Sequence, residues 1–421
     1  MAKLDALAKK KEEELKEFKP RSRGYMIFLV VFMGLVGNMD NFISLVESRI
    51  IPEIIAFYPW LNKDTFAFWQ SIYGIISFAV FFIAWFFDAF GRRKGILLLM
   101  STLAIPCLFI GLFPGNFFFI MTMYGISIMA TQSNAWQIPI TEESPSKKRG
   151  IYGGLTFLIG LIPIYAFVAG RISTSLGWYW AYGIMFFLFL ILLIPLYFMK
   201  ETERWKTSRQ EDHGGKYLKI KDAIKSLTKK DILYVAISSI VYTLWSISFK
   251  MGTSWGGEYY INVVGIPEEQ YDTYLTIGGL LTMVGAGIGG LLLDKLGRIG
   301  TLLIGCIGSA IGFFFLGFTQ EPIFFWMIYL FMPVVLAWIM VYFGEIFPTR
   351  IRSTAVGITN TAARSSYVTG PLIASALFLI DPDMFLLWMV AGIIILIPTL
   401  SLLIKPYETK GQSLEEIERD R

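Results

Sequence analysis

The sequence predicts an all-α membrane protein in which twelve transmembrane helices form two pseudo-symmetric six-helix bundles. Three observations support this fold class. Of the 421 residues, 55% are apolar and only 16% are charged, whereas a typical soluble domain has about 25% charged residues. The apolar residues form long continuous runs, separated by loops in which positive charge recurs. Motifs of acidic and basic residues in the first half of the chain recur in the second half.

Each apolar run is long enough to cross a bilayer as a helix, which takes about 20 mostly apolar residues. The runs are continuous rather than alternating, which excludes a transmembrane β-barrel, and lipid cannot hydrogen-bond an open backbone, so helices remain. We predict spans near 25–46, 66–87, 95–114, 117–140, 151–170, 178–199, 232–255, 273–293, 299–318, 322–344, 353–380 and 384–404. The predicted domains are a tail at 1–23, a first bundle at 24–199, a linker at 200–231, a second bundle at 232–404 and a tail at 405–421.

The positions of the basic residues predict the topology. Of the 37 Lys and Arg residues, 32 lie in the two tails, in the linker and in the loops after the second, fourth, eighth and tenth spans. All of these segments fall on one side if the spans alternate, so the positive-inside rule predicts a plasma-membrane protein with both termini in the cytoplasm. The net charge of +5 therefore reflects topology and not nucleic-acid binding. The other five basic residues are Arg49, Lys63, Arg171, Lys250 and Arg364.

Three short motifs recur at nearly constant offsets of 206, 203 and 207 residues, which indicates an internal duplication. Parallel repeats suit a transporter that rocks one half against the other around a site at mid-membrane. Arginine–carboxylate pairs at the cytoplasmic mouth could close a gate. Alternatively, these charges only anchor helix ends and set the orientation. The motifs are Asp88-Ala-Phe-Gly91-Arg92-Arg93 with Asp294-Lys-Leu-Gly297-Arg298, Glu142 and Arg149 with Glu345 and Arg352, and Glu201 with Glu408.

The duplicated Asp-x-x-Gly-Arg loop resembles the hallmark of the major facilitator superfamily. Within it, the segment Glu345–Arg352 and the tail Tyr407–Ile417 are similar to the sugar-porter branch. Carriers of organic ions and aromatic acids share the Glu-x-x-Pro-x-x-x-Arg pattern. The resemblance implies alternating access and a cytoplasmic gate that consists of Asp88, Gly91, Arg92, Arg93, Glu142, Arg149, Glu201, Asp294, Gly297, Arg298, Glu345, Arg352 and Glu408.

The residues that sugar porters use for polyol binding are missing from this chain. Their span seven usually carries a glutamine pair, but the segment Tyr242–Gly252 has no glutamine. Their span-five glutamine corresponds to Phe157, and the span-four arginine has no counterpart within 117–140. We therefore discount a typical hexose as the substrate.

Asp40 is the clearest charge inside a predicted span, about two-thirds along the first one. Such a group costs on the order of 3 kcal/mol to insert, so it needs a partner or a function. A buried carboxylate there could exchange a proton with the cavity, and Asp40 resembles the span-one acid of proton-coupled metabolite carriers. Alternatively, it is a structural acid satisfied by Asn38, Asn41 or helix ends.

Arg364 places a permanent positive charge in span eleven, because a guanidinium does not deprotonate in proteins. This charge favours an anionic substrate, and the segment resembles the arginine-containing span eleven of organic-anion and aromatic-acid carriers. Alternatively, Arg364 only forms a salt bridge with Asp40.

Lys250 is expected to snorkel to the outer interface. The other candidates could line the cavity or pack between helices. The full set of substrate-binding candidates is Arg364, Asn134, Gln137, Tyr242, Trp245 and Lys250.

Together these features predict a secondary transporter, with proton symport of a small organic anion or related metabolite as the first hypothesis. A sugar or polyol carrier with an atypical site is the second. A non-transporting receptor or sensor on the same fold is the third.

The chain has no Walker-type phosphate loop, which excludes ATP-driven transport by this chain alone. No catalytic or metal-ligand cluster stands out, so we expect no enzyme activity, no cofactor and no nucleic-acid partner. The expected partners are the substrate, protons and the lipid bilayer, with the monomer as the functional unit.

Overall fold

The structure is a computed structural model that describes residues 21–131, 133–145, 148–206, 227–347, 352–403, 408–412 and 416–417. Every regular element in these ranges is a helix, which confirms the predicted all-α fold class. The first twenty residues, most of the predicted linker and much of the C-terminal tail lie outside the described residues. The exact domain boundaries in those segments stay predictions.

We refer to residues 21–206 as the first half and to residues 227–417 as the second half. The first half forms α2 (Arg23–Leu45), α3 (Glu47–Phe57), α4 (Lys63–Gly74), η1 (Ile75–Ala79), α5 (Val80–Phe90), α6 (Arg92–Leu112), α7 (Phe117–Ala130), η2 (Ala135–Gln137), α8 (Ile138–Glu143), α9 (Arg149–Gly160), α10 (Ile164–Leu176) and α11 (Trp178–Phe198). The second half forms α14 (Lys229–Ser254), η4 (Glu258–Val264), α15 (Glu268–Lys295), α16 (Gly297–Thr319), α17 (Pro322–Ile346), α18 (Arg352–Ala363), α19 (Ser366–Ile380), α20 (Phe385–Leu396) and η5 (Ile397–Leu403).

Ten helical segments among the described residues are long and apolar enough to cross a membrane. The other two predicted spans are also helical but are shorter or broken. The fourth is divided into α7, η2 and α8, and the twelfth consists of α20 followed by η5. Spans five and eleven are interrupted at 161–163 and 364–365. Non-helical backbone at membrane depth is tolerated where protein groups satisfy its hydrogen bonds. The residues at these breaks are therefore candidates for a functional site.

The first span agrees with the prediction. We expected it near 25–46, and the apolar helix α2 covers Arg23–Leu45. A second helix, α3, follows almost directly and extends to Phe57. The N–H of Val46 donates to the Phe42 carbonyl at 2.8 Å, so helical hydrogen bonding carries on to the junction. Two charged residues, Glu47 and Arg49, therefore lie in a helix that continues the first span and not in a loop.

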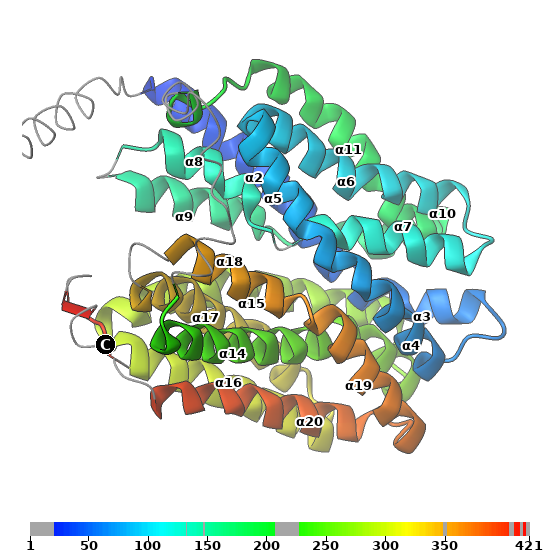
Figure 1. Cartoon of the computed structure of the whole chain (residues 1–421). Coiled ribbons are helices and arrows are strands. Elements are labelled where there is room, and N and C mark those ends of the chain that lie inside the picture. Colours follow the sequence, from blue (N-terminus) through cyan, green and yellow to red (C-terminus); the bar gives the residue numbers. More distant parts are fainter. Residues whose placement is uncertain are drawn as a thin grey trace, which may run out of the picture.

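The helices of the two halves lie in two groups (Figure 1). We call the end that carries Arg21, Arg92, Arg298 and Glu408 the terminal face, and the end that carries Arg49 and Asp272 the opposite face. Across the halves, α4 packs against α19, α3 against α14 and η4, and α10 against α15. In Figure 1 these elements meet toward the opposite face, while the groups diverge toward the terminal face. The two halves are therefore joined mainly from the centre to the opposite face.

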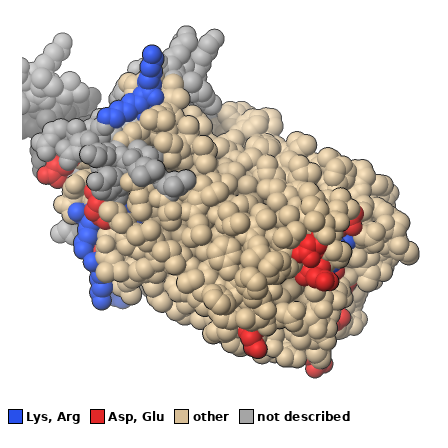
Figure 2. Space-filling model, turned by 90° about the horizontal axis from the view of Figure 1, so that it is seen from below, with Lys and Arg blue, Asp and Glu red and all other residues tan. Residues whose placement is uncertain are grey.

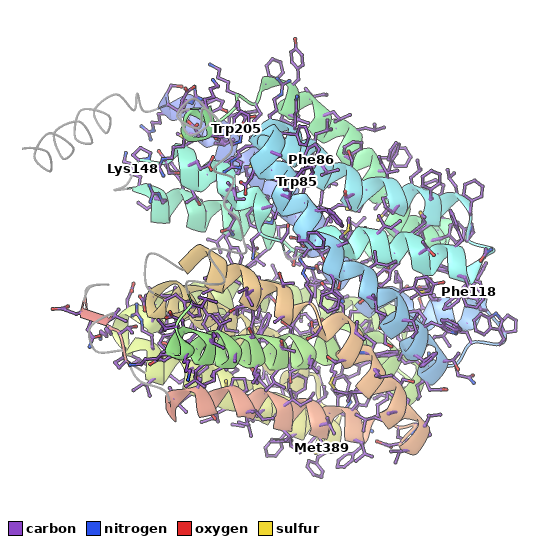
Figure 3. The ribbon with its side chains drawn as sticks, in the orientation of Figure 1. Trp85, Phe86, Phe118, Lys148, Trp205 and Met389 are labelled. Atoms are coloured by element: carbon purple, nitrogen blue, oxygen red, sulfur yellow. The ribbon has the colours of Figure 1, made fainter. Side chains whose placement is uncertain are left out.

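The outer surface has the composition expected for a protein surrounded by lipid. In the view of Figure 2 a broad uncharged region separates the charged side chains of the terminal face, where most of the visible Lys and Arg lie, from those of the opposite face, which are mainly Asp and Glu. Large apolar side chains project outward, such as Trp85 with 59% of its surface exposed and Phe118 with 45%. Figure 3 shows Phe118 at the periphery and Lys148 at the terminal face.

Candidate transport site and gates

Arg364 joins the broken spans of the two halves. It lies in the interruption between α18 and α19, and only 4% of its surface is exposed. Its guanidinium donates to the carbonyls of Ile128, at 3.4 Å, and of Thr131. These carbonyls end α7, where a helix carries partial negative charge. The hydroxyls of Thr131 and Tyr367 lie 2.9 Å apart and add a second link. A fixed cation from one half thus caps a helix of the other half.

Asp40 is buried in α2, with 6% of its surface exposed. Two of its contacts are the Ser44 hydroxyl, which donates at 3.4 Å, and the Trp136 indole N–H, which donates at 3.3 Å. The Trp136 ring stacks on Phe157 with centroids 6.4 Å apart. Phe157 is the position where a sugar porter would carry its span-five glutamine, so here an aromatic ring that packs on Trp136 takes the place of an amide.

Asn38 satisfies the break in span five. Its amide nitrogen donates to the carbonyls of Gly160, at 3.3 Å, and Ile162, at 2.6 Å, between α9 and α10. The alternative in which Asn38 is the structural partner of Asp40 is therefore disfavoured, because the amide hydrogens of Asn38 are directed at span five.

Tyr242 is buried and lies within electrostatic range of both Arg364 and Asp40. It therefore marks the region where the two charges converge. Trp245 stacks on Phe249, with centroids 5.1 Å apart, and its indole N–H donates to the Met332 carbonyl at 3.0 Å. The polar edge of Trp245 is thus engaged within the second half.

The two polar candidates of span four lie where that span is broken. Asn134 has a left-handed φ of 51°, and Gln137 ends the short helix η2. Both are partly exposed. The break therefore brings amide groups close to the buried Asp40 and Arg364 region, because Trp136 between them contacts Asp40.

The expected snorkelling of Lys250 is wrong. Only 5% of its surface is exposed, and its Nζ lies 2.8 Å from Oε2 of Glu47 in the other half. The Ser254 hydroxyl donates to the same oxygen at 3.0 Å, and the Gln70 amide donates to the other oxygen at 2.8 Å. We missed Glu47 because the first span was predicted to end one residue before it.

A second group of charges closes the opposite face. Arg49, with 1% of its surface exposed, forms ion pairs with Glu53 at 2.5 Å, Asp272 at 2.5 Å and Glu268 at 2.6 Å. We call these four residues the opposite-face cluster. Glu268 and Asp272 belong to the second half, so the cluster joins the halves. The sequence signal was an arginine four residues before a glutamate, a spacing that places both side chains on one face of a helix.

Backbone packing confirms that the halves meet closely there. The Ser48 and Tyr271 hydroxyls, one from each half, are 2.5 Å apart. A Cβ on Gly257 would overlap the carbonyl oxygen of Ser48. Only glycine permits such an approach of two backbones. The structure therefore shows the opposite face in a closed state.

The first-half gate residues form one network at the terminal face. Arg92 pairs with Asp88 at 2.8 Å and with Glu142 at 2.6 Å. The Glu201 carboxylate accepts the Arg92 backbone N–H at 2.7 Å, which caps the start of α6. Gly91 has a φ of 97°, and a Cβ there would overlap this carboxylate. The glycine is thus required by both its conformation and its close neighbour.

The second half repeats this arrangement. Arg298 donates to Glu345 at 3.0 Å, and Glu408 accepts the Arg298 backbone N–H at 2.9 Å. Gly297, with a φ of 80°, is again packed against the capping carboxylate. Thr409 donates to Glu345 at 2.5 Å just as Thr202 donates to Glu142 at 2.6 Å in the first half. The duplication inferred from the motifs is therefore visible in their contacts.

The remaining gate candidates are more peripheral. Asp294 is exposed and acts on Arg298 through its charge. Arg93 donates to the Tyr197 carbonyl at 3.1 Å. Arg149 and Arg352 begin α9 and α18, and the side chain of Arg352 lies outside the description. The arginine–carboxylate contacts of the two terminal-face networks, within the described ranges, each stay inside one half.

Residues 26–371 match the sequence profile of the Major Facilitator Superfamily. The chain belongs to this superfamily. It is a multi-pass integral membrane protein and a secondary transporter of small molecules, not an enzyme.

Relatives of this Major Facilitator Superfamily member carry different cargoes. The glucose transporter GlcP of Staphylococcus epidermidis is 25% identical over 389 residues, covering 79% of this chain and 82% of that protein. The cis,cis-muconate transport protein of Acinetobacter baylyi is 23% identical over 305 residues, covering 69% and 72%. The inward-open xylose transporter XylE from E. coli has the same fold, with a TM-score of 0.67, 20% identity and coverage of 94% and 99%.

Proposed function

We propose that this transporter is a proton-coupled symporter of a small organic anion that works by alternating access. The observation that carries the proposal is the convergence of a buried acid and a buried arginine from opposite halves. Asp40 and Arg364 are 6% and 4% exposed, and both contact the broken span four, Asp40 through Trp136 and Arg364 through Thr131. A site between the halves is where a rocking transporter binds its substrate.

Arg364 supplies the selectivity for an anion in this proposal. Its partners, the carbonyls of Ile128 and Thr131, are neutral. A substrate carboxylate forms stronger charge-assisted and bidentate hydrogen bonds with a guanidinium than a carbonyl does. Substrate binding therefore exchanges weak partners for a strong one, and it releases a contact that ties the two halves together.

Asp40 supplies the proton coupling. Its neighbours Trp136 and Ser44 donate neutral hydrogen bonds, and Phe157 adds an apolar ring above Trp136. A carboxylate in such surroundings changes the charge of the cavity by one unit when it takes up a proton. Loading and unloading of Asp40 can therefore be linked to the movement of an anion.

We further propose that the terminal face is cytoplasmic and that the protein resides in the plasma membrane. On the side shown in Figure 2 most of the visible Lys and Arg lie at the terminal face, together with some Asp and Glu, and the opposite face is mainly acidic. The positive-inside rule orients such a protein with its basic face in the cytoplasm. The closed opposite face is then the extracellular one, and the structure represents an inward-facing state.

The test compares matched acidic and neutral compounds on the purified protein. Glucuronate is compared with glucose, and benzoate with benzyl alcohol, first by thermal shift and then by uptake into proteoliposomes with an imposed pH gradient. We expect an acid to bind and to accumulate with the proton gradient, and Arg364→Gln to lower acid binding by at least about tenfold, the low end for a charge-assisted hydrogen bond.

A neutral sugar or polyol is the second candidate substrate, and the similarity to the glucose transporter GlcP favours it. Binding of glucose to the wild type, with no response to either acid, would make the anion assignment wrong. Unchanged accumulation by Asp40→Asn under the same pH gradient would remove Asp40 from the coupling role.

A further inference from the structure

The Glu47–Lys250 pair lies between the Asp40 and Arg364 region and the opposite face. The roles proposed for Asp40 and Arg364 do not account for this pair. Glu47 belongs to α3 of the first half, and Lys250 to α14 of the second half. Their side chains are 2% and 5% exposed and their charged atoms are 2.8 Å apart. The pair is thus a fully buried ion pair across the interface that must open when the transporter changes state.

The surroundings of the pair contain few other charges. The groups that face it from packed elements are the tyrosines Tyr124 of α7, Tyr182 of α11 and Tyr367 of α19. The ring of Tyr367 lies 5.0 Å from the Lys250 ammonium. Arg49, two residues after Glu47, is engaged by the opposite-face cluster. One negative and one positive charge therefore balance each other in a nearly neutral environment.

Opening of the opposite face separates α3 from α14 and exposes both charges to water. Reclosure must bury them again, and burial of an uncompensated charge is strongly unfavourable. Two combinations of charges leave the buried site with no net charge and therefore permit the opposite face to close. In the first, ionised Glu47 pairs with Lys250, as in the structure. In the second, an external anion pairs with Lys250 while Glu47 is protonated.

We propose that Lys250 is a second anion-binding site, which takes the carboxylate of the substrate when the opposite face is open while Glu47 takes up the accompanying proton. This inference rests on the proposed function. The proton comes from solution at the opposite face and bonds to a carboxylate oxygen of Glu47. The ammonium of Lys250 then donates to the substrate carboxylate, and the net charge of the site is zero before and after.

The same charge balance enforces coupling. Closure with a proton and no anion would bury a net charge of +1, and closure with an anion and no proton would bury −1. Both are penalised by the cost of an unpaired buried ion. The site therefore admits the proton and the anion together and resists the leak of either.

The cavities beside the pair indicate the class of ligand. One is lined by Glu47 together with aromatic rings that include Phe66, Phe117, Tyr124 and Tyr182. The other is lined by Lys250, with Gln70 and Ser254 as hydrogen-bonding groups and Trp255 as an aromatic wall. Each cavity measures only about 10 Å³ in the closed state, which is room for about one water. An organic anion can therefore enter only when the opposite face opens, and the same linings then favour a small monocarboxylate with an apolar or aromatic body.

The test uses three variants of the full-length protein: Glu47→Gln, Lys250→Met and the double variant. Spin labels at Asn62→Cys and Asp383→Cys report the opposite face, because the neighbouring Lys63 ammonium donates to the Pro382 carbonyl across the halves. The native Cys107 and Cys306 are buried and do not compete for label.

In spin-label measurements without ligand, we expect Glu47→Gln to shift the equilibrium of the opposite face from closed to open by at least about 160-fold at every pH from 5 to 8. This factor is the low end of the range for breaking a buried pair. The double variant should return to the closed state, because no charge is left unpaired. A closed distance distribution in Glu47→Gln would overturn the proposal.

In the binding arm the probes are benzoate and glucuronate. Affinity of the wild type should fall as pH rises, with a limiting slope of about tenfold per pH unit, since one proton is taken up with each anion. Glu47→Gln should bind with no such dependence, and Lys250→Met should bind at least about tenfold more weakly, as expected when a charged hydrogen-bond partner is lost. A merely structural pair would not change the pH slope.

The outcomes separate the two proposals. If Arg364→Gln loses acid binding while Lys250→Met retains it, the proposed function stands and this inference is wrong. If neither acid binds the wild type or Glu47→Gln, both are wrong. If Lys250→Met loses acid binding and Glu47→Gln loses its pH slope, this inference is supported even where Asp40→Asn still accumulates substrate.

Discussion

Arg49 offers the sharpest test of how the opposite face is held closed. The perturbation is Arg49→Met, which keeps an unbranched side chain of similar length and removes the charge. In the structure Arg49 neutralises three carboxylates at 2.5–2.6 Å, two of them from the other half. Without it, Glu53, Glu268 and Asp272 would repel one another in the closed state. Opening of the opposite face relieves that repulsion, so the variant should favour the open state.

The magnitude follows from burial. Removal of one partner from a fully buried pair costs about 3–5 kcal/mol, whereas an exposed pair contributes at most about 1 kcal/mol. Arg49 is 1% exposed, but its partners are 21%, 45% and 27% exposed, so water screens part of the interaction. We expect Arg49→Met to destabilise the closed state relative to the open state by about 2–3 kcal/mol. At 1.36 kcal/mol per tenfold, this is about a 30- to 150-fold change in the ratio of closed to open protein.

The assay is the distance distribution between spin labels at Asn62→Cys and Asp383→Cys in nanodiscs. The matched control is Arg171→Met, which removes an exposed arginine from α10 and should leave the distribution unchanged. The double variant Arg49→Met with Asp272→Asn should shift the closed–open equilibrium by less than the sum of the shifts of the two single variants, because both residues belong to one cluster. If Arg49→Met keeps the wild-type distribution, the cluster does not hold this face closed.

The other predictions concern the central acid and the terminal face. Asp40→Asn should abolish uphill proton-driven uptake but spare counterflow exchange, measured in proteoliposomes, because exchange needs no net proton movement. Gly297→Ala should lower the free energy of unfolding by about 1–3 kcal/mol, the cost of a strained backbone, because Gly297 has a φ of 80° and abuts Glu408. The control is Gly290→Ala, whose added Cβ meets no neighbouring atom. Equal melting temperatures of the two variants would contradict this prediction. Burial raises the pKa of Glu408, but hydrogen bonds from the backbone N–H of Arg298 and of two other residues outweigh it and hold the pKa below its usual value. Its contribution to stability is therefore present above the unfolded pKa of about 4.3 and lost as pH falls through the lower folded pKa, so Glu408→Gln should show a flatter acid limb in a melting-temperature series from pH 6 to pH 3.

Much of the architecture could be predicted from local sequence. The apolar runs predicted the helices because each had to span lipid with its backbone satisfied internally. The repeated motifs predicted that Arg92 and Arg298 occupy equivalent places, and both are bound by acids of their own repeat. These inferences succeeded because they depend on residues that are near in sequence or on a repeat that the chain carries twice.

Other features could not be predicted in this way. The apolar run predicted a first span that ends at residue 46, so Glu47 and Arg49 were placed outside it. Their partners Lys250, Glu268 and Asp272 lie more than two hundred residues further along the chain. A buried charge is tolerated only when a distant segment supplies its counterion, and hydropathy contains no information about that segment.

The sequence by itself determined the all-helical membrane fold, the duplication, the terminal-face networks and the presence of charges at Asp40 and Arg364. The tertiary structure decided what those charges meet. It directs Arg364 at the end of α7, places the indole N–H of Trp136 against Asp40, and pairs Lys250 with Glu47 across the halves. The reason is that helix formation depends on neighbours along the chain, whereas the fate of a buried charge depends on which helix packs against it.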